Sequence, residues 1–143
     1  MSKITRRTMA ASLPALLAGA SPAEAADLLP SAMVNADEAE VRKKEGVTTG
    51  RLFFQGMTRE DIRVELHETI LPPGKAPHAA HRHLREEMVI VKEGTLRVEI
   101  EGEETKEVTA GGAVYVASNK MHGWTNAGDS TATYFVVEIG NDS

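Results

Sequence analysis

Three histidines and two glutamates lie close together at the start of an apolar run, in HAAHRHLREEMVIVKEG at residues 78–94. Alternate side chains share a face in an extended chain, so His81, His83 and Glu87 have one parity and Glu86 has the other. The apolar residues that follow continue the first parity, which predicts that this face turns into the core. Two imidazoles and a carboxylate directed into an apolar interior are costly unless something pairs with them.

A divalent transition metal would satisfy these groups, because neutral imidazole nitrogen and carboxylate oxygen are good ligands for Fe, Mn, Ni or Zn. Residues 78–87 alone leave a second interpretation open, a solvent-exposed, charge-rich turn. The segment GGAVYVASNKMHGWTN at residues 111–126 adds His122 from a separate strand pair and favours the metal. The sequence has no cysteine, so a metal must be held by histidine and carboxylate ligands.

The elements that must position these residues are short strands. From Arg51 onward, extended runs alternate with Gly, Pro, Asn and Asp, a spacing typical of a β-sandwich or barrel. About eight strands with tight turns and almost no helix predict an all-β antiparallel barrel or jelly roll, in which closure protects the strand edges. The predicted strands are residues 51–54, 61–71, 81–91, 96–100, 104–109, 113–118, 122–126 and 131–140.

The first histidine segment resembles the first motif of the cupin superfamily. That motif has a Gly, a His-x-His, three or four residues, a Glu, six residues and a Gly. Here His81 and His83 are followed by three residues to Glu87 and by six more to Gly94. The leading Gly74 lies one residue further from His81 than is usual, a departure within a loop.

The second segment resembles the second cupin motif, which has a Gly, then Pro-x-Gly, two residues, a His, three residues and an Asn. Gly111, His122 and Asn126 occupy matching positions, whereas Ala117 replaces the usual Pro and Asn119 the second Gly. Asn tolerates the left-handed backbone conformation that Gly would provide, so we expect the turn to form.

The resemblance covers about residues 60–140 and implies a double-stranded β-helix with one bound metal ion. The implied ligands are His81, His83, Glu87 and His122, which leave one or two coordination positions for water or substrate. We expect an oxidoreductase of the dioxygenase type acting on a small organic molecule. Since the family also includes oxalate-processing enzymes, lyases and sugar isomerases, an isomerase or lyase stays open.

A non-catalytic protein that binds or senses a metal or small ligand is the contrasting hypothesis. No catalytic residue is identified, and no second carboxylate is predicted on the inward parity near His122.

Other residues have simpler interpretations. His78 is predicted to be solvated and His67 to lie on the surface; Trp124 is predicted in the core or pocket wall, with substrate stacking left open. Tyr115 is a candidate hydroxyl beside a metal ligand.

The first 25 residues resemble a twin-arginine signal peptide. TRRTMA at residues 5–10 precedes a short apolar run, and Ala23-Glu24-Ala25 fits the small-x-small rule for cleavage after Ala25. Met9 stands where such signals usually have Phe or Leu, which leaves the general secretory route open. We expect a periplasmic or secreted protein without a membrane span in its mature form.

Removal of residues 1–25 would change the formal net charge from −5 to about −7. So acidic a chain is a poor binder of nucleic acid or anionic membrane, and we expect a small-molecule partner.

Residues 26–50 are predicted to form an N-terminal arm, with a short strand near Met33-Val34 and at most one helical turn within residues 37–42. Residues 51–143 form the barrel. Its RLFF strand is expected to be an unpaired edge that pairs in a homodimer.

Overall fold

A computed structural model describes residues 28–142, and the predicted signal peptide and its cleavage point at Ala25 lie outside them. The described residues form nine strands and no helix, and hence no helix that is long and apolar enough to cross a membrane. The all-β prediction is confirmed. The strands are β1 (Glu40–Lys44), β2 (Thr48–Met57), β3 (Arg63–Leu71), β4 (Glu86–Glu93), β5 (Thr95–Ile100), β6 (Lys106–Thr109), β7 (Ala113–Val116), β8 (His122–Asn126) and β9 (Ala132–Ile139).

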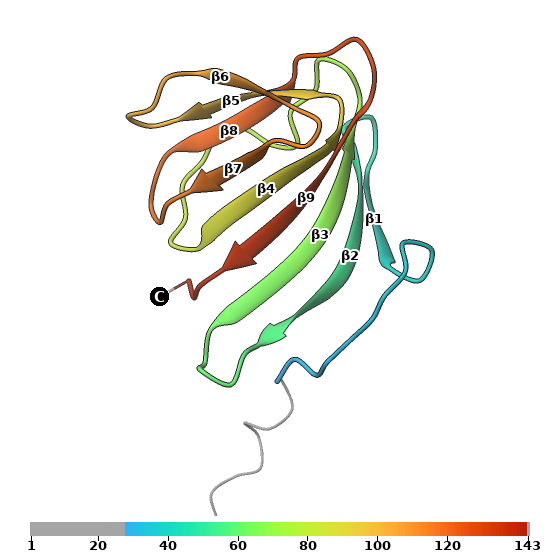
Figure 1. Cartoon of the computed structure of the whole chain (residues 1–143), viewed down its shortest axis with the longest axis vertical. Helices are drawn as coiled ribbons and strands as arrows, with labels where there is room; N and C mark the ends of the chain where they lie inside the picture. The colour runs from blue at the N-terminus through green and yellow to red at the C-terminus, as the bar shows by residue number, and fades with distance from the viewer. Residues whose placement is uncertain (1–27, 143) are drawn as a thin grey trace, which may run out of the picture.

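Two antiparallel sheets make up the jelly roll. The larger sheet has the order β1-β2-β3-β9-β4-β7 and the smaller has the order β6-β5-β8. Figure 1 shows the smaller sheet beside the β4–β7 end of the larger one, while β1 and β2 form the opposite edge. The C-terminal strand β9 lies between β3 and β4, so residues from three distant parts of the chain become neighbours.

The core fills the space between the sheets and follows strand alternation. On β4, Glu87, Val89 and Val91 are buried, whereas Glu86, Met88 and Ile90 are exposed, which confirms the predicted parity. Full burial of each aliphatic core side chain contributes about 1.5–3 kcal/mol. The core cluster consists of Leu71, Val89, Val91, Leu96, Val98, Trp124, Ala132, Tyr134 and Val136.

Two turn positions need an unusual backbone conformation. Gly94 has a φ of 83°, and a Cβ there would lie 2.8 Å from the Cα of Ala132, so only glycine fits between β4 and β5. Asn119 has a φ of 60°, as predicted for the residue that replaces the usual glycine. Gly94 ends the first histidine segment, and Asn119 lies within the second.

The N-terminal expectations need correction. No strand forms at Met33-Val34, and a turn at residues 36–38 leads into the strand β1 instead of a helical turn. The RLFF segment is not an edge, because β2 pairs with β1 on one side and with β3 on the other. The edge is β1, whose exposed and mostly charged side chains suit an unpaired strand. The edge-pairing argument is therefore wrong, and the homodimer stays a prediction.

Candidate metal centre

Backbone hydrogen bonds fix the loop before β4 against the start of β8. His81 and His122 form an isolated antiparallel bridge, with N···O distances of 3.0 and 2.8 Å. The N–H of Asn119 donates to the carbonyl of His83 at 2.8 Å, and Glu87 is the second residue of β4. Only Glu87 and His122 belong to regular strands. His81 and His83 instead lie in a loop that these bonds hold in place.

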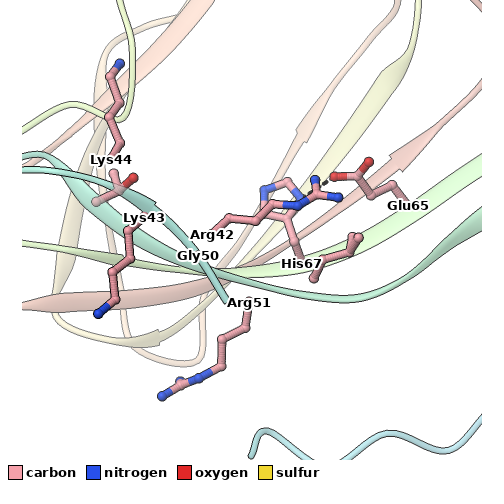
Figure 2. A pocket seen from close by; sticks show the side chains of 9 residues that line it. Arg42, Lys43, Lys44, Gly50, Arg51, Glu65 and His67 are labelled. Atoms are coloured by element: carbon pink, nitrogen blue, oxygen red, sulfur yellow. Dashed lines mark hydrogen bonds and ion pairs between the residues drawn. The ribbon is translucent and has the colours of Figure 1, made fainter. Parts of the chain in front are cut away.

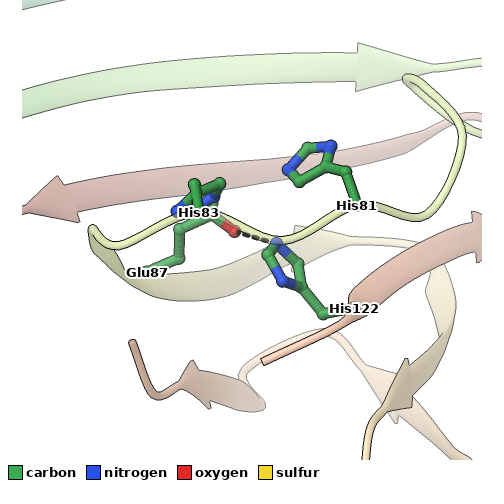
Figure 3. A group of neighbouring side chains, drawn as sticks. All are labelled: His81, His83, Glu87 and His122. Atoms are coloured by element: carbon green, nitrogen blue, oxygen red, sulfur yellow. Dashed lines mark hydrogen bonds and ion pairs between the residues drawn. The ribbon is translucent and has the colours of Figure 1, made fainter. Parts of the chain in front are cut away.

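The four predicted ligands come together in the structure. One ligand atom from each of His81, His83, Glu87 and His122 lies within 4.8 Å of the others. Figure 3 shows the three rings around the Glu87 carboxylate. The ring centroids lie 4.9–5.1 Å from one another. Glu87 Oε1 lies 3.2 Å from His83 Nε2, and Oε2 lies 3.0 Å from His122 Nε2.

Backbone carbonyls set the orientation of two of these rings. Nδ1 of His83 lies 2.8 Å from the Arg85 carbonyl oxygen, and Nδ1 of His122 lies 2.8 Å from the Lys120 carbonyl oxygen. A carbonyl only accepts, so each Nδ1 must be the protonated donor, and in a neutral ring Nε2 carries the lone pair. Both Nε2 atoms face the Glu87 carboxylate. Carbonyl-held rings of this kind are typical of histidines that bind a metal.

The most buried atoms of the group test whether a metal fits. His122 is 2% exposed and Glu87 is 4% exposed. His122 Nε2 and Glu87 Oε2 have no hydrogen-bond partner among residues 28–142. Unsatisfied buried groups of this type cost free energy, and a shared cation would remove that cost. Three imidazole nitrogens and one carboxylate oxygen are a donor set that suits a divalent transition metal.

The surroundings of His81 favour its neutral form. Burial lowers the pKa of His81 below its ordinary value, and the neighbouring His78, His122 and His83 lower it further. Glu87 opposes the shift but has the smallest effect. The neutral imidazole is the form that binds a metal, so the surroundings of His81 favour a ligand role over a protonated side chain.

A cavity of about 180 Å³ opens beside this group. Its aromatic wall includes Trp124, which is 5% exposed and donates from Nε1 to the Tyr134 hydroxyl at 2.9 Å. Burial raises the pKa of Tyr134 to about 12, so this hydroxyl stays protonated at neutral pH. The prediction that Trp124 is a core or pocket-wall residue is confirmed. Glu87, His78, His67, Thr69, Pro77, Val136 and Glu138 complete the lining.

Two predictions about single side chains are wrong. Tyr115 is 57% exposed and lies on the outward parity of β7, away from the ligands. Tyr134 on β9 is the buried tyrosine at the cavity. His67 is not a surface residue, because it lines the cavity on the same parity of β3 as the buried Thr69 and Leu71. The signal that would have identified the inward face of β3 is the buried Leu71 at its end, which shares the parity of His67.

Sequence reasoning also missed a second carboxylate. Glu138, near the end of β9, is the cross-strand neighbour of Glu87 and lines the same cavity. The structure therefore adds an inward carboxylate on β9 beside Glu87, outside the segment around His122 for which none was predicted. His78 is exposed, as predicted, yet its ring stacks on His81 with centroids 4.2 Å apart and borders the cavity.

Comparisons with known proteins agree with this architecture. The cupin domain family matches residues 67–138. No curated protein matches the sequence. Among solved structures, an RmlC-like cupin from Shewanella frigidimarina is 16% identical, with a TM-score of 0.64 over 78% of this chain and 93% of the other.

Two further structures show how varied proteins of this fold are. A predicted oxalate decarboxylase from Thermotoga maritima is 18% identical, with a TM-score of 0.61 over 77% of this chain and 100% of the other. A sugar phosphate isomerase of the cupin superfamily from Silicibacter pomeroyi is 18% identical, with a TM-score of 0.62 over 77% and 76%. At these identities the likeness extends to the fold alone.

Proposed function

Because the chain belongs to the cupin superfamily, we propose that it is a metal-dependent oxidoreductase of the dioxygenase type that acts on a small organic molecule. The proposed ligands of one divalent metal ion are His81, His83, Glu87 and His122. The observation that carries the proposal is the contact between His122 Nε2 and Glu87 Oε2, two buried atoms 3.0 Å apart without a hydrogen-bond partner in the described chain.

A metal ion held there with open coordination positions would supply Lewis-acid or redox activation of a bound molecule. The side chains of the chain itself provide the rest of the site. Trp124 and Tyr134 form an aromatic wall that shapes the cavity. His67 and Glu138 place polar groups on the side formed by β3 and β9, where they can orient a substrate. Iron or manganese is the preferred ion, because two histidines and one carboxylate, here with a third histidine, suit Fe-dependent oxidation.

The experiment that tests this proposal combines metal analysis with turnover. Purified protein is analysed for Fe, Mn, Ni and Zn and then supplied with small acids, phenols and sugars while oxygen consumption is recorded. We expect about one metal ion per chain and metal-dependent oxygen uptake with at least one compound. Bound metal without turnover would favour the binding or sensing alternative. Metal-dependent conversion without oxygen uptake would favour an isomerase or lyase.

We also propose export to the periplasm by the twin-arginine route, on the basis of Arg6 and Arg7 in the N-terminal sequence. A receptor reads these side chains, so replacing both by Lys should leave the precursor in the cytoplasm. Cell fractionation with an antibody against the protein measures this, and N-terminal sequencing of the exported form should begin at Ala26. Unchanged export of the double Lys variant would favour the general secretory route.

A further inference from the structure

A second hollow, of about 220 Å³, lies on the β1–β2 side of the barrel and is rich in positive charge. This charge is unusual, because the whole chain has a formal net charge of −5. Only one acidic residue lines the hollow, Glu65. The cationic side chains that line it are Arg42, Lys43, Lys44 and Arg51, and His67 lies at its inner end. We call this hollow the basic pocket.

The basic pocket adjoins the cavity at the candidate metal centre. His67 lines both hollows, and Glu65 Oε1, 3.0 Å from His67 Nδ1, fixes the ring between them. Lys44 lines the basic pocket, and its Nζ donates to the carbonyl of Pro77 at 3.2 Å. Pro77 in turn lines the metal-centre cavity. The two hollows therefore meet at His67, and the Lys44–Pro77 hydrogen bond joins their linings a second time.

Strand alternation separates the cations of the basic pocket into two groups. Arg42 and Lys44 share one face of β1, and Lys43 has the opposite parity. In Figure 2 the Arg42 side chain extends toward His67, whereas Lys43 and Arg51 extend to the other side of the strands. Arg51 is committed to an ion pair with the buried carboxylate of Glu68. Arg42 and Lys44 are thus the cations on the side of His67.

Arg42 can exchange its present partner for a ligand. Its Nε lies 3.1 Å from Glu40 Oε1, and both side chains are about half exposed or more. An exposed pair of this kind is held weakly, because water screens it. A planar guanidinium matches the two oxygens of a carboxylate, and Lys44, on the same face of β1, adds a second positive charge to the basic pocket.

We propose that the basic pocket and the metal-centre cavity form one ligand site, and that its ligand is a small organic carboxylate paired with Arg42, with Lys44 adding positive charge to the same pocket. The remainder of the ligand extends past His67 into the cavity lined by Trp124. This inference rests on the proposed function, since it takes that cavity as the place of reaction. Arg42 and Lys44 precede residue 67, where the match to the family begins, so the family match does not include them.

Trp124 provides a direct measurement of binding, because it is the only tryptophan of the chain and lines the cavity. The protein is titrated with three carboxylates and their amides, which are nearly equal in shape but differ in charge: butanoate, benzoate and 3-phenylpropanoate. Tryptophan fluorescence is recorded with zinc and, separately, with a chelator. We expect at least one carboxylate to bind about tenfold more tightly than its amide under both conditions.

The double variant Arg42→Gln, Lys44→Gln should lose this preference, whereas Arg97→Gln, an exposed arginine paired with Glu107 on the small sheet, should retain it. Circular dichroism establishes that each variant is folded. Equal binding of every acid and its amide would overturn the proposal. So would a preference that the double variant retains or that the chelator abolishes, because the metal alone would then select the carboxylate.

This outcome is independent of the test for oxidation. A carboxylate preference without any oxygen uptake would support the anion site and refute the proposed oxidation. Oxygen uptake with uncharged compounds and no preference for carboxylates would support the proposed oxidation and refute the anion site.

Discussion

The barrel contains two groups of histidine and carboxylate side chains that look alike in composition but differ in how their charges are satisfied. The first is the candidate metal centre at His81, His83, Glu87 and His122. The second consists of Glu65, His67 and Glu138, whose ligand atoms also lie within 4.8 Å of one another. Both groups face the same cavity, through Glu87 in the first and through His67 and Glu138 in the second.

Arginines compensate the second group. Arg85 lies 2.7 Å from Glu138, Arg63 lies 3.8 Å from Glu65, and Glu65 accepts the contact with His67 Nδ1. In the first group, Glu87 has no Lys or Arg ion pair within residues 28–142, and its partners are imidazoles whose protonated nitrogens bind backbone carbonyls. Arginine side chains therefore pair with the carboxylates of the second group, whereas within residues 28–142 no lysine or arginine pairs with Glu87, which leaves room for a metal cation there. The surrounding cations, more than the ligand types, therefore distinguish a candidate metal site from an internal ion-pair network.

The largest expected effect is the loss of metal from the first group. The double variant His81→Ala, His83→Ala removes two of four ligands and should lower bound metal at least tenfold, while the barrel stays folded because neither residue belongs to the core cluster. Elemental analysis after dialysis against limiting metal measures this. His67→Ala, from the second group, is the matched control and should keep its metal. Full metal content in the double variant would remove the proposed site.

A smaller effect is expected from one carboxylate. Glu87→Gln keeps the size of the side chain but removes the charge among the imidazoles, so metal affinity should fall about tenfold or more. Its neighbour Glu86 is exposed on the opposite face of β4, and Glu86→Gln should leave affinity unchanged. Competition with a chromophoric chelator gives both affinities. Equal weakening in the two variants would contradict the assignment of the inward face.

Replacing Arg85 makes the second group resemble the first, because Glu138 then lacks its arginine partner. Arg85→Gln leaves Glu138 partly buried without its partner, and we expect a loss of about 1–3 kcal/mol in the free energy of unfolding. Urea denaturation measures this loss. Arg97→Gln, in an exposed pair, should cost about 0.5 kcal/mol or less. Equal losses in the two variants would show that Arg85 does not compensate a buried charge.

The pH dependence of the Arg85→Gln variant follows from Glu138. Burial raises the pKa of Glu138, and Arg85 opposes that shift, so the variant should raise the pKa further. When the pKa of a carboxyl is higher in the folded protein than in the unfolded chain, the folded protein becomes less stable as pH rises through the folded pKa. The destabilisation should therefore be larger at pH 8 than at pH 5, and the opposite order would contradict this account.

The smallest effect concerns the aromatic wall beside both groups. Burial raises the pKa of Tyr134 to about 12, whereas an unfolded tyrosine titrates near 10. The stability that Tyr134 contributes is therefore present below about pH 10 and is lost as pH rises toward 12. Ultraviolet titration of the Tyr115→Phe variant, which retains Tyr134 as its only tyrosine, should show the phenolate forming near pH 12 or together with unfolding. Ionisation near pH 10 in folded protein would place the hydroxyl in water.

Three members of the first group were predictable from local information, because the spacing from His81 to Glu87 and the apolar parity beyond Glu87 identify one face of one strand. His122 comes from a distant segment, and the resemblance to the second cupin motif, with Asn119 at the turn before it, implied that it joins the other three. The all-β architecture followed from turn residues between short runs. Strand parity and turn residues depend on neighbours in the sequence, so the sequence alone predicts them.

The second group was missed because it depends on strand order. Glu138 lies beside Glu87 only because β9 inserts between β3 and β4, and residue spacing contains no record of that pairing. His67 was predicted to lie on the surface because it shares a parity with Arg63 and Glu65, although that parity ends in the buried Leu71. The position of β1 outside β2 was missed for the same reason, since a strand rich in charge resembles a linker until its partner is known.

The central position of β9 also limits when the site can form. Glu87 is on β4, and β4 is held in the large sheet by β9 on one side and β7 on the other. Both of these strands follow β4 in the chain, so a nascent chain that has emerged only as far as residue 100 lacks the partners that hold the ligands in register. Pairing of such distant segments makes folding slow. Assembly of the metal centre should therefore be a late event, completed only after β9 has left the ribosome.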